Sequence, residues 1–174
     1  PDMSYLVKNK EKIRGVFITH GHEDHIGAVG YLLKEVNIPV YGAKLTLGLL
    51  ESKLNEMSLL TSAKLVVVDS TSKISIGCFK LEFIPVNHSI PDTYVVVITS
   101  PVGIILHTAD FKIDFNPVSE KVTDLNRFSE VGNRNVLLMM ADSTNATKEG
   151  YSMSEKAVGD SLDNLFRKAS SRII

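Results

Sequence analysis

Apolar residues recur along this chain at two spacings, one typical of helices and one typical of strands. They return every three or four residues over 26–36 and 43–57, which predicts two amphipathic helices. A third stripe predicts a helix over about 154–170, and the pattern Ser152-x-x-Glu155 predicts a capping box at its start. The apolar residues of this third stripe, which are expected to face inward, are Val158, Leu162, Leu165, Phe166 and Ala169.

Short apolar or alternating runs predict strands over much of the remaining chain. The run 136–140 is apolar throughout, which is typical of a buried strand, whereas the mixed stretch 111–134 predicts a loop. Strands separated by helices favour an α/β (α+β) fold in which helices cover the outer faces of sheets. The predicted strands are 14–19, 40–41, 65–69, 73–76, 78–86, 93–99, 104–108 and 136–140.

The composition is typical of a globular domain. Of the 174 residues, 44% are hydrophobic and 22% are charged. Cys78 is the single cysteine, which excludes a disulfide framework and suits a reducing compartment, so we expect a cytoplasmic protein. No apolar run approaches the roughly 18 residues of a membrane span, and no membrane partner is expected. The net charge of −1 does not indicate a nucleic-acid partner, although bound divalent ions would add positive charge locally.

Three of the five histidines lie within one six-residue motif, His20-Gly21-His22-Glu23-Asp24-His25. Imidazole nitrogens and carboxylate oxygens are ligands for zinc and related divalent metals. Surface loops also collect polar residues, but this density favours a metal site. The motif follows the predicted strand 14–19, at the carboxyl end where α/β sheets place their sites. Structural zinc favours thiolates, and Cys78 is the single cysteine of this chain, so the site is predicted to be catalytic with an open coordination position.

Two further candidate ligands follow predicted strands. His88 comes after 78–86, and Asp110 comes after 104–108. Either residue alone is more typical of an ordinary loop than of a ligand, but beside the first motif they supply a third imidazole and a bridging carboxylate. His107 is interpreted instead as a packed histidine, or as one that steadies a metal ligand through its other ring nitrogen.

Four segments together resemble the metallo-β-lactamase fold hydrolases, and more narrowly the bacterial ribonuclease J family. In chain order they read FITHGHEDHIGA at 17–28, VNHSIPD at 86–92, HTADFK at 107–112 and ADSTNA at 141–146. The first is common to the superfamily, whereas its combination with the last is far more specific. The resemblance covers the whole chain and implies a metallo-β-lactamase-like αββα sandwich that is only partly contained in it.

The resemblance also implies a site with two zinc ions, which manganese could replace. Asp24 and Asp110 are the expected catalytic residues, and Asp24 would orient a metal-activated hydroxide. The implied ligands are His20, His22 and His88 for one ion, Asp24 and His25 for the second, and Asp110 as a bridge between them. A further histidine ligand and the general acid are expected outside this chain.

Ser143, Thr144 and Asn145 are the expected contacts to the phosphate or sugar of the substrate. Turn formation and helix capping suit the same residue types equally well.

The family has a β-CASP domain inserted into its hydrolase domain. We therefore expect a metallo-β-lactamase-like domain over 1–150, without its first strands, and the start of a β-CASP domain over 151–174. The apolar residues after Arg172 are expected to open a strand of that second domain. The chain is thus expected to be an internal segment of a longer enzyme and inactive by itself.

The implied function is a zinc-dependent ribonuclease, both a 5′-to-3′ exonuclease and an endonuclease, in RNA processing and decay. Its expected partner is RNA, and the intact protein could form a homo-oligomer. One alternative is another hydrolase of the superfamily, such as a glyoxalase-type thioesterase. The other alternative is a metal-free scaffold module.

Overall fold

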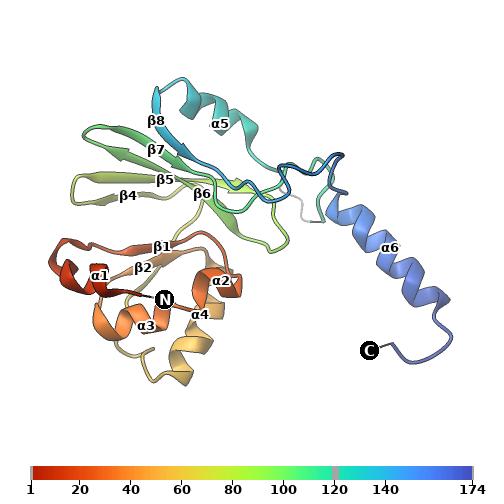
Figure 1. Cartoon of the computed structure of the whole chain (residues 1–174), viewed down its shortest axis with the longest axis horizontal. Coiled ribbons are helices and arrows are strands. Elements are labelled where there is room, and N and C mark those ends of the chain that lie inside the picture. Colours follow the sequence, from red (N-terminus) through yellow and green to blue (C-terminus); the bar gives the residue numbers. More distant parts are fainter. Residues whose placement is uncertain (1, 119–121, 174) are drawn as a thin grey trace.

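Two β-sheets face each other, and helices cover the outer face of each sheet (Figure 1). This computed structural model describes residues 2–118 and 122–173. Pro1, Ile174 and residues 119–121, the last within the predicted loop 111–134, lie outside the described residues. The arrangement is the αββα sandwich that the sequence predicts.

The first sheet contains three parallel strands in the order β1-β2-β3. Parallel neighbours require crossover connections, and here helices make them. The strands are β1 (Val16–Ile18), β2 (Val40–Gly42) and β3 (Leu65–Val67). The helices of this half are α1 (Ser4–Lys8), the 3-10 turn η1 (Lys10–Lys12), α2 (Glu23–Ile26), α3 (Val29–Glu35) and α4 (Lys44–Glu56).

The second sheet contains five strands in the order β4-β5-β6-β7-β8. The pairs β4–β5, β5–β6 and β6–β7 are antiparallel, whereas β8 runs parallel to β7. The carboxyl ends of β5, β7 and β8 therefore lie at the same edge. The strands are β4 (Lys73–Ile76), β5 (Phe79–Val86), β6 (Thr93–Ser100), β7 (Gly103–His107) and β8 (Val136–Met140).

Three apolar layers hold the sandwich together. Leu47, Leu50 and Leu54 of α4 pack with Val40 in the layer outside the first sheet. Between the sheets, the rings of Phe17 and Phe83 stack with centroids 4.8 Å apart. Outside the second sheet, Val131 of helix α5 (Leu125–Gly132) packs in a layer with Ile84, Val86, Val95, Val97, Ile104 and Leu106.

Helix α5 corrects the prediction of a loop over 111–134. Asp124 caps the helix by accepting a hydrogen bond from the backbone N–H of Arg127 at 3.1 Å. The helix has only eight residues, too few for a clear periodic signal. Its position depends on contacts with β5, which lies far away in sequence.

Helix α6 (Glu155–Lys168) extends away from the sandwich (Figure 1). The prediction that its apolar stripe faces inward is wrong for this chain, since the exposed fraction of Leu165 is 66% and that of Phe166 is 57%. The prediction that 136–140 is buried is also wrong, because Leu137 through Met140 of β8 are exposed. Apolar periodicity predicts an element but not whether its packing partner belongs to the same stretch of chain.

The ends of the α6 region also differ from prediction. Ser154, rather than Ser152, caps the helix and accepts a hydrogen bond from the N–H of Ala157 at 3.1 Å. Arg172 and Ile173 lie in no strand, and Ile174, the last residue of the strand expected there, lies outside the described residues. Within the described ranges, no helix is long and apolar enough to span a membrane.

Candidate metal centre

Residues from three separate strand ends meet at one edge of the sandwich. His20 follows β1, His88 follows β5 and Asp110 follows β7. The two sheets are joined at this edge by a hydrogen bond of 3.0 Å from the Tyr94 N–H to the Thr19 carbonyl. The fold therefore brings side chains that are ninety positions apart in sequence into one cluster.

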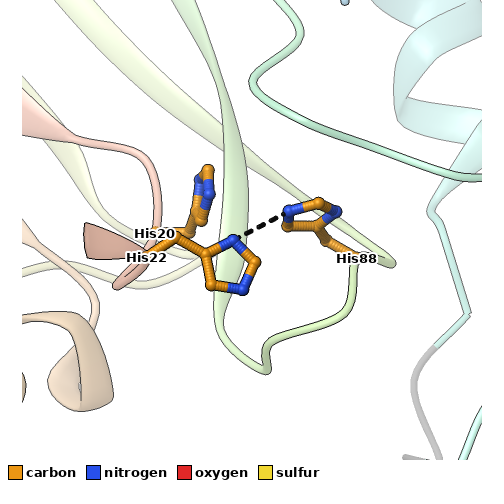
Figure 2. Close-up of side chains that lie close together, drawn as sticks. All are labelled: His20, His22 and His88. Carbon is orange, nitrogen blue, oxygen red and sulfur yellow. Dashed lines mark hydrogen bonds between the residues drawn. The ribbon is translucent and has the colours of Figure 1, made fainter. Parts of the chain in front are cut away.

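One group of possible ligands contains His20, His22 and His88, whose ligand nitrogens all lie within 4.8 Å of one another. Nε2 of His88 lies 3.1 Å from Nδ1 of His22, and Figure 2 shows the three rings turned toward a common space. The ring pairs meet edge to face, with centroids 4.8 Å apart between His20 and each of the others. Three nitrogens in this arrangement suit one divalent ion.

A second group contains His20, His25 and Asp110. Oδ2 of Asp110 lies 3.9, 3.5 and 3.7 Å from Nε2 of His20, His25 and His88, respectively. This carboxylate therefore lies among imidazoles of both groups. Its position suits a ligand shared by two neighbouring ions.

Asp24 lies at the margin of the cluster. Its side chain is 79% exposed, and its Oδ2 lies 3.5 Å from Nε2 of His25. Asp24 and His25 belong to helix α2, which begins right after His22, so the motif is only partly a loop. The carboxylates of Glu23 and Asp24 in the first turn favour a helix start there.

Burial makes the charged form of His20 unfavourable. Its side chain is fully buried, and desolvation together with the nearby His25 and His88 lowers the pKa of His20 to about 4. Desolvation, followed by the nearby His22, also lowers the pKa of His88. Neutral imidazole is the form that binds metal.

The donor set fits a divalent metal. Nε2 of His20 is buried and has no hydrogen-bond partner among the described residues, although it faces the other imidazoles and Asp110. An unpaired buried nitrogen is costly unless it has a ligand to bind. A metal ion would satisfy this atom and the lone pairs around it.

Hydroxyl groups contact the outer nitrogens of two of these histidines. Oγ1 of Thr19 lies 3.0 Å from Nδ1 of His20, and Oγ of Ser89 lies 3.4 Å from Nε2 of His22. Such contacts fix the ring orientation and the tautomer of a metal-binding histidine. Sequence reasoning missed both roles. Thr19 adjoins a predicted ligand, which is a usable signal, but no local pattern connects Ser89 to His22.

Ser143, Thr144 and Asn145 lie in an exposed turn after β8. The N–H of Thr144 donates to Oδ1 of Asp142 at 2.9 Å, and bonds from Thr144 lower the pKa of Asp142. The N–H of Asp142 donates to Oγ1 of Thr108 at 3.1 Å, which ties this turn to the segment that carries Asp110. The segment that contains these three residues thus forms a turn, which is the role that the sequence suggested beside substrate contact.

An open cavity of about 610 Å³ adjoins the cluster. His88 and Ser89 line it on the side of the metal centre, while Ile90, Val118 and Glu155 contribute other parts of its wall. A substrate could therefore approach His88 from solvent.

Comparison with known proteins identifies the family. The sequence profile of the Metallo-beta-lactamase superfamily matches residues 3–147, which include every residue of the cluster. The chain belongs to the metallo-beta-lactamase superfamily.

This member of the metallo-beta-lactamase superfamily is also similar over its full length to several proteins named Ribonuclease J. It is 45% identical to that of Helicobacter pylori strain J99 over 175 residues, which are 100% of this chain and 25% of the relative. It is 42% identical to that of Thermus thermophilus over 180 residues, which are 99% of this chain and 31% of the relative. The chain thus spans about a quarter to a third of the length of these curated relatives. The predicted resemblance is confirmed.

A solved structure supports the metallo-beta-lactamase fold of the chain. A protein of unknown function from Enterococcus faecalis V583 aligns over 92% of this chain and 40% of its own length, with a TM-score of 0.65 and 19% identity. At this identity the likeness concerns the fold alone.

Proposed function

We propose that the intact protein is a metal-dependent ribonuclease of the ribonuclease J type. The observation that carries the proposal is the convergence of four histidines and Asp110 at one sandwich edge in a chain 37–45% identical to proteins of that name. Its substrate would be RNA, cleaved both from the 5′ end and internally. We further propose a cytoplasmic location, which suits the single cysteine.

The cluster would hold two ions, with zinc as the proposed metal and manganese as its substitute. His20, His22 and His88 would hold one ion, His25 and Asp24 the other, and Asp110 would contact both. A bound ion pair supplies Lewis acidity toward phosphate oxygens and lowers the pKa of water to near neutrality. The ring of His20 lies fully buried at the bottom of the proposed site, and close packing would hold this ring in place.

Asp24 would orient the attacking water. Its exposed carboxylate faces solvent beside His25, so it can accept a proton at the mouth of the site. Ser143, Thr144 and Asn145 would contact the RNA backbone through hydroxyl, amide and backbone N–H groups. Their turn is tied to the segment of Asp110 through Thr108, which keeps the two near each other.

We also propose the domain boundary expected from sequence, with the hydrolase domain over 1–150 and a β-CASP domain starting within 151–174. Two features support a boundary near 151. Helix α6 leaves the sandwich (Figure 1), and its apolar side chains are exposed in the described chain. A helix with such a face needs further protein to cover it.

The substrate class is tested with the intact protein on two substrates. Wild-type protein is expected to degrade 5′-monophosphorylated RNA and not to hydrolyse a glutathione thioester. His22→Ala and Asp110→Ala are each expected to reduce RNA cleavage by at least about a thousandfold, since each removes a proposed metal ligand. Thioester hydrolysis without RNA cleavage would instead identify another hydrolase of the superfamily. A protein with neither activity and no bound metal would be a scaffold.

A further inference from the structure

We propose that His107 is a positioning residue. Its Nδ1 holds the backbone turn at Ala109, and this turn directs the Asp110 carboxylate into the histidine cluster. The inference rests on the proposed role of Asp110 as a metal ligand. It assigns His107 a specific task, whereas the sequence left packing and support of a ligand as alternatives.

The turn at Ala109 is conformationally unfavourable. Its φ angle is +58°, in the left-handed region that residues with a Cβ rarely adopt, and its side chain is buried. Such a conformation persists only where surrounding contacts hold it. The N–H of Ala109 donates to Nδ1 of His107 at 3.1 Å, and this bond acts on the turn itself.

The chain on both sides of the turn is fixed independently. Before it, the N–H of Thr108 donates to the Met140 carbonyl at 3.0 Å. After it, the N–H of Lys112 donates to the Asn87 carbonyl at 2.8 Å. The ends of the segment therefore remain attached if His107 is changed, and the expected loss is confined to the orientation of Asp110.

The geometry of His107 also argues against a ligand role for the same nitrogen. An Nδ1 atom that accepts the Ala109 hydrogen has its lone pair occupied, so the ring proton is on Nε2. Among the described residues, His107 belongs to neither group of candidate ligands. Its contribution to metal binding would therefore be indirect, through the position of Asp110.

The test measures zinc affinity of the intact protein by competition with a chelator, without any activity assay. His107→Ala should bind zinc at least about tenfold more weakly, which is the usual size of an outer contact. His107→Asn should stay within about threefold of wild type, because its amide oxygen can accept the same N–H. Adding Ala109→Gly to His107→Ala should restore most of the affinity, because glycine adopts a positive φ without strain.

Asp110→Ala is the control that separates this proposal from the proposed function. If Asp110→Ala binds zinc as wild type does, the assignment of the metal ligand fails. If Asp110→Ala loses zinc while His107→Ala keeps it, only the role of His107 fails. Equal losses in His107→Ala and in its combination with Ala109→Gly would also overturn the proposal, since glycine cannot repair lost packing. Should His107→Ala not fold, weak zinc binding by a folded His107→Asn protein overturns it, and retained binding supports it.

Discussion

His20 is the residue where the two groups of candidate ligands meet. It belongs to both, its ring is fully buried, and its Nε2 faces Asp110 at 3.9 Å. Among the described residues this nitrogen has no hydrogen-bond partner, and a buried unpaired nitrogen lowers stability unless a metal binds. In the proposed metal centre, the metal-free protein would therefore be less stable than the metal-bound protein.

The lowered pKa of His20 predicts how the metal-free protein responds to acid. The pKa of an unfolded histidine is 6.5, whereas that of His20 in the folded protein is about 4. As pH falls from 6.5 to 4, the unfolded state takes up a proton that the folded state does not. The free energy of unfolding should therefore fall over this range, by on the order of 2–3 kcal/mol.

Chemical denaturation of chelator-treated protein at a series of pH values measures this dependence. The matched variant is His20→Gln, which cannot take up the proton and should show a flatter dependence over the same range. An equally steep dependence in the variant would show that other groups cause it.

The residues of the site were predictable to different degrees. His20, His22 and His25 stand in one motif, and His88 and Asp110 lie two and three residues after the ends of β5 and β7, so the sequence is sufficient to identify them as candidates. The contact of Ser89 with His22 joins residues 67 positions apart, and the positive φ of Ala109 follows from its surroundings. Neither has a local signal in sequence.

At the scale of elements, Arg127 of helix α5 and Arg134, which follows the helix, attach this region to the second sheet. The carboxylate of Glu82 in β5 forms ion pairs with Nη2 of Arg127 at 3.0 Å and with Nη1 of Arg134 at 2.7 Å. Burial alone would raise the pKa of Glu82, but the bonds from Arg134 and Arg127 lower it overall. The ion pairs of Glu82 therefore stabilise the folded protein at pH values above the usual pKa of a glutamate, and this stabilisation is lost as the pH falls through the lowered pKa of Glu82.

Glu82→Gln should destabilise the intact protein by about 1–2 kcal/mol, because two arginines lose a partly buried charged partner. The control is Glu130→Gln, which removes the exposed partner of the same Arg127 and should cost at most about 0.5 kcal/mol. Thermal unfolding of both variants measures the difference. Equal losses would mean that the attachment through Glu82 has no special importance.

Helix α6 is anchored at its first residue. The carboxylate of Asp114 is nearly fully buried and accepts the N–H of Glu155 at 2.8 Å and that of Asn116 at 2.9 Å. The bond from Glu155 is the main cause of the lowered pKa of Asp114. Lys112 adds an ion pair with Glu155 at 2.7 Å.

Removing this anchor should loosen the start of α6. Asp114→Ala is expected to speed hydrogen exchange of the amides of 155–158 by about tenfold or more, because a bond to a buried carboxylate is lost. Asp114→Asn keeps an acceptor oxygen and should show a smaller increase. Unchanged exchange in Asp114→Ala would mean that other contacts hold the helix.

At the scale of the whole molecule, the sandwich was predictable, but the burial of its peripheral elements was not. The periods of apolar residues predicted the strands and the helices over 43–57 and 154–170. They could not show that β8 and α6 leave apolar side chains exposed, since packing partners can lie elsewhere in a protein. The chain spans 25–31% of the length of the ribonuclease J relatives named above, so we assign the proposed activity to the intact protein.

The most direct test of the account is RNA cleavage by the intact protein as zinc is removed and restored. Wild-type protein should lose cleavage after chelation and regain it with zinc or manganese. His88→Ala should remain at least about a thousandfold slower at every metal concentration, because it lacks one of the three imidazoles proposed to hold the first ion. Cleavage at a near-normal rate by metal-free protein, or by His88→Ala, would contradict the account.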